Sequence, residues 1–514
     1  MNKVAKVYSG SNVGLDSFLI EVEVDIGLGL PSFTIVGLPD KAIDESKERI
    51  RAAIKNSNLS FPQHRLTINL APADVKKEGP SFDLPMTIGV LISDRQVEQS
   101  EDIEKSLFVG ELSLNGNLRH VNGILPLVIY GAKNGFDRIY LPEVNQEEAS
   151  IVSGIEIFPV KSLKQLVSHL RGVELIKPVK RERVELSEPT EEEADNEYDF
   201  AFVSGQEQAK RALEIAAAGN HNVFMSGPPG SGKTLLARSM VSIMPGMQEE
   251  EMIEVTKIYS VAGLFKENER LISQRPFRSP HHTTSSVALI GGGQWPRPGE
   301  ISLSHRGLLF MDEFPEFPRS VLEALRQPLE DGIVTVSRAA GSLTFPADFL
   351  LVAAQNPCPC GYSTDPEKSC ICTPLQVIKY QKKISGPLLD RFDLCVEVPR
   401  LRFDKIAKTG VAEKSSEIKK RVEKAKAIQI ERFKDAPFIT NSKISSKYIK
   451  AFCQLDEEAE KILARAVDQM ALSGRVYHKI LKVARTIADL EGSEKIRSHH
   501  LAEALQYRRQ EKTY

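Results

Sequence analysis

The strongest constraint on the fold of this chain is the eight-residue segment Gly227-Pro228-Pro229-Gly230-Ser231-Gly232-Lys233-Thr234. It fits the pattern G-x-x-x-x-G-K-[ST] at every position, and that pattern requires a buried strand before it and a helix after it. Residues 221–225 suit the strand, and residues 235–244 suit the helix. Backbone N–H groups of such a loop surround phosphate oxygens, Lys233 adds positive charge, and Thr234 offers a hydroxyl to Mg²⁺. The segment predicts an α/β core that binds a nucleoside triphosphate with Mg²⁺.

Length and composition predict a globular protein of several domains. A chain of 514 residues exceeds one ordinary core, so roughly two to four domains are expected. The formal net charge of −2 gives no overall positive field for nucleic acid, although a local basic pore stays compatible with it. No signal-peptide pattern opens the chain and no run of about 18 apolar residues occurs, which predicts a cytoplasmic protein with no membrane association.

Changes in composition predict three domains and a linker. Residues 171–199 combine charge and proline with few apolar side chains, which is typical of a solvated linker. An N-terminal domain is expected over 1–170 and the nucleotide-binding core over 200–399. Residues 400–514 are rich in Lys and Glu at helical spacing and predict an all-helical lid.

Polar side chains follow two further apolar runs of the core. Residues 308–311 precede Asp312 and Glu313, the arrangement expected of a strand that ends at a magnesium site. Asp312 is expected to hold Mg²⁺ through water, and Glu313 to orient and polarise the attacking water. Residues 349–354 form a third apolar run before Asn356. Asn356 either reaches the γ-phosphate or the water, or is a turn residue at the end of a strand.

In this order of strands the chain resembles the AAA+ superfamily, where the polar residue at the position of Asn356 is called sensor 1. Residues 385–394 resemble the arginine-finger segment of the clade of minichromosome-maintenance helicases and magnesium chelatase motor subunits. The resemblance implies that Arg391 enters the active site of a neighbouring subunit and that the subunits form a hexameric ring. An ion pair between Arg391 and Asp390 or Asp393 is the alternative.

The lid contains a further arginine of this type. Arg475 precedes the amphipathic segment 476–490 and resembles the sensor 2 arginine, which acts on the nucleotide of its own subunit. Arg485 on the same segment is a second candidate for that role.

Two segments of the core are candidates for DNA contact. Residues 275–300 contain stiff prolines, a glycine hinge and Trp295, the one tryptophan of the chain. Trp295 is suited to stacking on a base and Arg297 to contacting phosphate, but Trp295 is equally suited to anchoring the loop. The adjacent histidines 281 and 282 would face opposite sides of a strand, which disfavours a metal pair.

A hairpin is expected over residues 332–345, with its turn at 338–341. Its place before the sensor 1 strand resembles the pre-sensor 1 hairpin of helicase-like motors. That resemblance implies that Arg338 at the tip follows a nucleic-acid backbone, whereas a solvated turn residue is the alternative.

Four of the six cysteines lie in two C-x-C pairs within a short segment, namely Cys358, Cys360, Cys370 and Cys372. Four thiolates suit a tetrahedral Zn²⁺ site. Reduced structural thiols are an equal alternative, and a regulatory disulfide is a less favoured one.

The tract 66–85 resembles the nucleophile region of Lon-type peptidases, with Ser81 at the nucleophile position. These peptidases need a lysine to deprotonate the serine, and Leu125 occupies the corresponding position here. Lys76, Lys77 and Lys133 could replace it only with an altered geometry. We therefore expect a Lon-like fold without peptidase activity.

Together with the tracts 31–40, 278–282, 356–361 and 484–490, these features resemble the YifB/ComM family of magnesium chelatase-like ATPases over almost the whole chain. The resemblance implies a multidomain α/β protein with an N-terminal Lon-protease-like α+β domain, an AAA+ P-loop αβα core and a C-terminal all-α lid. It also implies a homohexameric, ATP-driven, helicase-type motor that binds single-stranded and branched DNA. Such a motor promotes branch migration when incoming DNA recombines during natural transformation. A protein-remodelling or chelatase-type ATPase is the alternative.

Overall fold

The computed structural model describes residues 4–38, 40–74, 77, 79–179, 198–265, 270–293, 296–338, 341–401, 412–470 and 472–508. It contains two compact units. The first comprises Met1–Ser187, Glu249–Ile272 and Pro296–Pro298, and the second comprises Glu188–Gln248, Ser273–Trp295 and Gly299–Tyr514. Most of the predicted linker, residues 180–197, lies outside the described residues.

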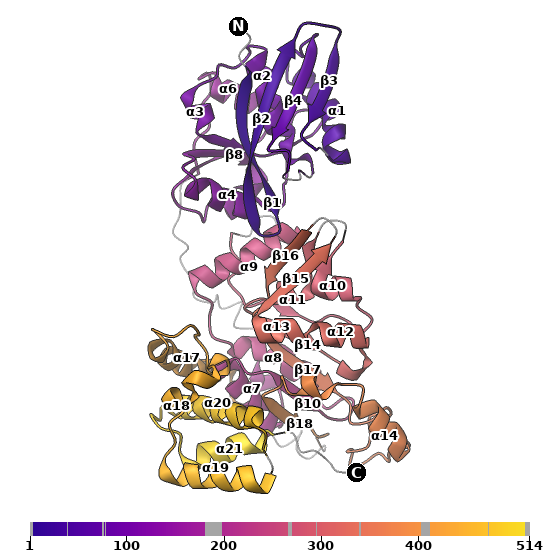
Figure 1. The fold of residues 1–514 in the computed structure, drawn as a ribbon, viewed down its shortest axis with the longest axis vertical. Helices are drawn as coiled ribbons and strands as arrows, with labels where there is room; N and C mark the ends of the chain where they lie inside the picture. Colours follow the sequence, from indigo (N-terminus) through magenta and orange to yellow (C-terminus); the bar gives the residue numbers. More distant parts are fainter. Residues whose placement is uncertain are drawn as a thin grey trace. The chain divides into compact units, whose positions relative to one another are not determined.

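A seven-stranded mixed sheet organises the first unit (Figure 1). Its strands, in spatial order, are β3 (Ser32–Val36), β4 (Arg65–Ala71), β2 (Asp16–Gly27), β1 (Ala5–Val13), β5 (Ser106–Phe108), β8 (Arg138–Pro142) and β9 (Glu156–Val160). Side chains of β4 alternate, so that Leu66, Ile68 and Leu70 are buried on one face. The helices of the unit include α1 (Lys41–Asn56), α2 (Asp83–Ser93), α4 (Ile124–Lys133) and α6 (Leu163–Leu170).

The first unit also includes a helix from the middle of the chain. Helix α9 (Glu249–Ala262) packs with α4. The N–H of Gly123 donates to the carbonyl of Ser260 at 3.1 Å, and the hydroxyl of Ser260 donates to the buried carboxylate of Glu148. The core range 200–399 expected from composition contains this segment, whereas its packing in the structure is with the first unit.

A five-stranded parallel sheet forms the centre of the second unit. The strands, in spatial order, are β11 (Phe277–Arg278), β14 (Leu308–Met311), β17 (Leu350–Gln355), β10 (Val223–Ser226) and β18 (Leu394–Glu397). Every residue of β14 is buried, as covered parallel strands require. The expected α/β core is confirmed, and its sheet is parallel.

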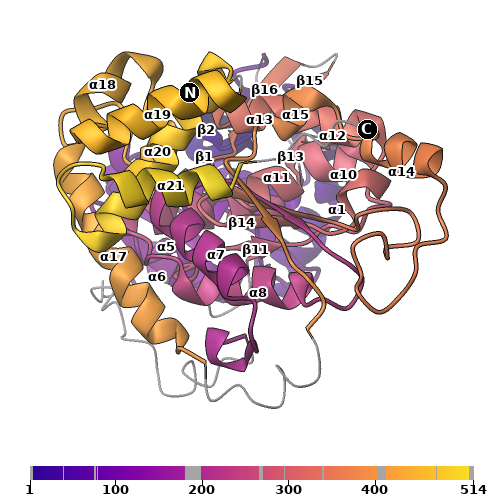
Figure 2. The ribbon, with the colours of Figure 1, turned by 90° about the horizontal axis from the view of Figure 1, so that it is seen from below.

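Helices cover this sheet and continue into the C-terminal region. Helices α7 (Glu207–Gly219) and α8 (Lys233–Ile243) share one hydrophobic core with the sheet and with α17 (Ser415–Arg432), α19 (Glu457–Met470), α20 (Gly474–Glu491) and α21 (Ser498–Gln506). Figure 2 shows α20 and α21 beside α7. The expected helical C-terminal region is confirmed.

The hairpin predicted before the strand that leads to Asn356, which is β17, is present. β15 (Ile333–Arg338) pairs with β16 (Gly341–Pro346) in antiparallel register, with Arg338 opposite Gly341. Two residues, 339 and 340, connect them and lie outside the described residues.

Candidate active site

The phosphate-loop segment connects the strand β10 to the helix α8. Geometry requires glycine at two of its positions. A Cβ on Gly227 would lie 2.1 Å from the carbonyl oxygen of Val398, and Gly232 has a φ of 92°. Helix α8 begins at Lys233, so Lys233 and Thr234, the last two residues of the motif, lie in its first turn. The N–H groups of a first turn have no partner within the helix and can bind phosphate. The strand, loop and helix together form a cradle suited to phosphate.

Lys233 is buried beside the loop and interacts with its carbonyl oxygens. Its Nζ lies 2.7 Å from the carbonyl oxygen of Gly227 and 2.9 Å from that of Pro228. It also lies 3.4 Å from Oδ1 of Asn356, which follows β17, so the structure brings this asparagine to the loop. Burial lowers the pKa of Lys233. A bound triphosphate would supply the negative charge that favours the protonated lysine.

Two oxygen ligands suited to Mg²⁺ meet next to the loop. The Thr234 hydroxyl donates to Oδ2 of Asp312 at 2.7 Å, and Oδ1 of Asp312 accepts the N–H of Glu313 at 2.8 Å. Asp312 directly follows β14, two strands from β10. Hydroxyl and carboxylate oxygens are ligands that Mg²⁺ prefers, so the donor set fits this ion with a nucleotide.

Glu313 has an unusual backbone and a histidine partner. Its φ is 50°, which is uncommon for a residue other than glycine, and its Oε2 lies 2.9 Å from Nδ1 of His282. This contact was not predicted. Residues 281 and 282 lie in a turn after β11 instead of on a strand, and their rings lie close together, with centroids 4.1 Å apart. The assumption that they face opposite sides was therefore wrong.

Arg391 lies at the edge of the sheet opposite the phosphate loop. The Asn222 side chain donates to the Arg391 carbonyl at 3.1 Å, and Val223, the first residue of β10, pairs with Leu394 of β18. The phosphate loop follows the other end of β10, which is four residues long and so spans about 13 Å. Arg391 is thus remote from the phosphate loop of its own chain.

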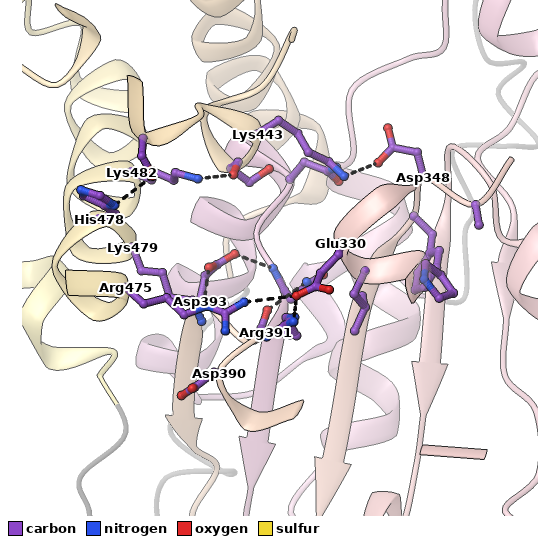
Figure 3. Close-up of a pocket in the computed structure, with 18 residues that line it drawn as sticks. Glu330, Asp348, Asp390, Arg391, Asp393, Lys443, Arg475, His478, Lys479 and Lys482 are labelled. Atoms are coloured by element: carbon purple, nitrogen blue, oxygen red, sulfur yellow. Dashed lines mark hydrogen bonds and ion pairs between the residues drawn. The ribbon is translucent and has the colours of Figure 1, made fainter. Parts of the chain in front are cut away.

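Arg391 forms an ion pair with Glu330 on helix α13 (Arg326–Asp331) (Figure 3). Asp390 and Asp393, the partners named in the alternative, are not in this ion pair. Asp393 instead contacts His221 at 3.4 Å and Lys479 at 3.9 Å. Burial lowers the pKa of Arg391, and the neighbouring charge of Arg475 lowers it further.

Arg475 shares the carboxylate of Glu330, with its Nη2 3.5 Å from Oε1. Both arginines line one cavity of about 280 Å³, together with the lysines Lys443, Lys479 and Lys482 (Figure 3). Arg475 therefore lies at the same edge as Arg391, away from the phosphate loop. The role of Arg475 on the nucleotide of its own subunit stays a prediction, and this position offers an action across a subunit interface as the alternative.

Arg485, the second candidate for the sensor 2 role, is a structural residue of the lid. It is 1% exposed, and its guanidinium pairs with Asp489 at 2.9 Å and donates to the carbonyls of Ser493 and Glu494. Its hydrogen bonds connect the end of α20 to the segment after it.

The four cysteines of the two C-x-C pairs converge. Their sulfur atoms all lie within 4.8 Å of one another, and Cys358 is buried. All four are free thiols. A hydrogen bond from the backbone N–H of Tyr362 is the main cause that lowers the pKa of Cys360 to about 6.

Comparisons with known proteins agree along the chain. Three family models match: "Magnesium chelatase, subunit ChlI" over residues 199–406, "Subunit ChlI of Mg-chelatase" over 22–145, and "Magnesium chelatase, subunit ChlI C-terminal" over 412–508. "Competence protein ComM" of Haemophilus influenzae is 43% identical over 98% of this chain and 97% of its own length. "Uncharacterized protein YifB" of Escherichia coli is 40% identical over 98% of this chain and 96% of its own length. The chain belongs to the YifB/ComM family of magnesium chelatase-like AAA+ ATPases.

In this YifB/ComM family member, no serine–lysine pair of the kind that Lon-type peptidases use is found at Ser81 among the described residues. Ser81 lies in a short turn before α2, and no described hydrogen bond joins its hydroxyl to a lysine. Leu125 is buried in α4. The buried ammonium of Lys77 donates to the carbonyl of Pro72, while Lys76 lies outside the described residues. The expectation of a catalytically inactive Lon-like domain therefore stays a prediction.

The DNA-contact candidates of this family member are described only in part. Arg297 is exposed in the short strand β13 (Arg297–Pro298). Trp295 and the side chain of Arg338 lie outside the described part of the chain. Among the described residues, no helix has the length and apolar character needed to cross a membrane.

Proposed function

We propose that this chain hydrolyses ATP with Mg²⁺ as a homohexameric ring and uses the cycle to move branched DNA. The proposed process is branch migration during recombination of incoming DNA in natural transformation, in the cytoplasm. The ring is supported by one observation: the proposed catalytic groups lie at opposite edges of one parallel sheet. The phosphate loop and Asp312 follow the carboxyl ends of their strands, whereas Arg391 precedes β18.

Each residue of the loop edge has a role in this proposal. The loop residues and Lys233 bind the phosphates, and Thr234 and Asp312 hold Mg²⁺, which would neutralise phosphate charge when bound. Glu313 orients the attacking water, and Asn356, 3.4 Å from Lys233 Nζ, contacts the γ-phosphate or that water.

The arginine edge supplies the other half of the site. Arg391 and Arg475 are remote from the phosphate loop of their own chain, so they can complete a site only across a subunit interface. There they stabilise charge on the transferring phosphoryl group. In this proposal the two arginines exchange the carboxylate of Glu330 for the triphosphate bound to the neighbouring subunit. Because one anionic partner replaces another, the cost of removing the arginines from water is limited.

The DNA substrate is supported by the relative named a competence protein and by the hairpin before the third core strand. In this proposal Trp295, Arg297 and Arg338 contact the DNA. The match to magnesium chelatase family models supports a second candidate, a protein-remodelling or chelatase-type motor that does not act on DNA.

The deciding experiment measures ATP hydrolysis and strand exchange together. The full chain is incubated with Mg²⁺ and ATP, with single-stranded DNA, duplex, or a labelled three- or four-stranded junction. Glu313→Gln protein serves as the matched control, because it keeps the binding residues. The expected result is DNA-stimulated hydrolysis with movement of the junction. Hydrolysis without any DNA response would favour the second candidate, and no hydrolysis under any condition would overturn the ATPase itself.

A further inference from the structure

We propose that Cys358, Cys360, Cys370 and Cys372 bind one Zn²⁺. The ion fixes the segment between β17 and α14, and this segment in turn positions Asn356 and supports the phosphate loop. The coupling to nucleotide rests on the proposed ATPase. Zinc binding itself does not.

The sulfur positions match the geometry of a tetrahedral zinc site. With Zn–S bonds of about 2.3 Å, neighbouring sulfurs of a tetrahedron lie about 3.8 Å apart. In the structure, Cys358 Sγ lies 3.4 Å from Cys360 Sγ and 3.7 Å from Cys370 Sγ, and the last two sulfurs are 3.5 Å apart. Small shifts in side-chain torsion would accommodate the ion.

Backbone hydrogen bonds already orient two of the sulfurs. The N–H of Cys360 lies 3.4 Å from Cys372 Sγ, and the N–H of Cys372 lies 3.4 Å from Cys370 Sγ. Such N–H···S contacts fix the direction of each sulfur, as the surroundings of a metal ligand do. Four apposed thiols without a metal would gain little from this arrangement.

The loop around the cysteines has no regular secondary structure, although Arg400 pairs with Asp365 and Glu367 in its middle. β17 ends at Gln355 and α14 (Pro374–Gln381) begins at Pro374, and the residues between them form neither helix nor strand. Loops of this length are uncommon in a compact domain unless something fixes them. A zinc ion would join the two ends of this loop, because one C-x-C pair follows β17 and the other precedes α14.

The same loop touches the nucleotide machinery. A Cβ on Gly361 would lie 2.7 Å from Cδ of Pro229, the third residue of the phosphate-loop motif, and 3.9 Å from Cγ of Asn356. Gly361 also has a φ of 87°, which favours glycine. Only one residue separates Asn356 from Cys358. The zinc-bound loop would therefore set the position of Asn356 from one side and support Pro229 from the other.

The first test measures metal and not activity. Protein purified without chelators is analysed for zinc by elemental analysis, and the metal-free protein is titrated with Zn²⁺. We expect about one zinc per subunit in the wild type and less than one tenth of that in Cys370→Ser/Cys372→Ser. Cys395→Ala is the matched control, because Cys395 lies on β18 outside the cluster, and it should retain the ion. Wild-type protein that neither contains nor binds zinc would overturn the proposal.

The second test measures the coupling. Binding of ADP is compared between zinc-loaded wild type, the same protein after chelation, and Gly361→Ala. We expect chelation to weaken ADP binding at least about tenfold, with restoration by Zn²⁺. Gly361→Ala should weaken it about tenfold while the zinc content stays at the wild-type level. Equal ADP affinity in all three would refute the coupling, even with zinc present. Because neither readout needs turnover, these results are separate from a failure of the ATPase proposal.

Discussion

Arg475 provides the sharpest prediction, because the structure places it away from the phosphate loop of its own chain. Sequence resemblance assigns it to the nucleotide of its own subunit, whereas the structure places it beside Arg391 on Glu330, at the edge opposite the phosphate loop. We therefore expect Arg475→Ala to abolish turnover in a homogeneous ring and to be rescued by subunits that lack Lys233.

The size of the rescue follows from how a shared site is built. In an equal mixture of Arg475→Ala and Lys233→Ala subunits, only the Arg475→Ala subunits have an intact phosphate loop. An intact site therefore needs an Arg475→Ala subunit to supply the loop. The neighbour that supplies Arg475 must be a Lys233→Ala subunit, because only that variant keeps this arginine. With random assembly each condition holds half of the time, so about one quarter of the sites are intact. If the sites act independently, the mixture recovers about one quarter of wild-type turnover.

The assay is ATP hydrolysis after the two purified variants are mixed and allowed to exchange subunits. Arg391→Ala mixed with Lys233→Ala is the positive control. The double variant Arg475→Ala/Lys233→Ala mixed with Lys233→Ala is the negative control, because it contains no intact phosphate loop. Rescue of Arg391→Ala but not of Arg475→Ala would refute the reasoning and return Arg475 to its own subunit.

Four further predictions concern the active site and the lid. Lys233→Ala should weaken ATP binding at least about tenfold in an equilibrium binding assay, because it removes the cation from the phosphate cradle; unchanged affinity would contradict this role. Glu313→Gln should bind ATP normally but turn it over roughly 100-fold more slowly, and retention of turnover would assign the base elsewhere. His282→Ala should raise turnover without DNA about fivefold, since a hydrogen bond of about 1 kcal/mol that holds Glu313 is lost, whereas a decrease would show that His282 orients Glu313 productively. Arg485→Ala should lower the free energy of unfolding by about 3 kcal/mol in urea, because it removes one partner of a buried ion pair; a change below about 1 kcal/mol would rule out a structural role.

The sequence was most informative where function depends on residues close together in the chain. The phosphate-loop motif predicted β10, the loop and α8, because backbone conformation within a few residues determines that cradle. Apolar runs predicted β14 and β17, and their parallel order brought Asp312 and Asn356 to the same edge as the loop. The cysteine spacing indicated a cluster for the same reason, since a short loop can bring two C-x-C pairs together.

The sequence was silent where two side chains meet from distant elements. Nothing local to Glu330 indicates that it pairs with both Arg391 and Arg475, which come from other parts of the chain. The contact of His282 with Glu313 was missed because it depends on a turn conformation that alternation along a strand does not describe. Likewise, the composition of residues 249–272 gave no sign that they pack with α4 of the first unit.

By itself, the sequence predicted the phosphate cradle, the candidate magnesium ligands and the identity of the candidate arginines. Those features depend on residue type and on short-range backbone geometry, which local spacing specifies. The tertiary structure decided at which edge of the sheet each charged group lies. That placement depends on strand order and helix packing, and it makes Arg475, like Arg391, a candidate for the nucleotide of the next subunit.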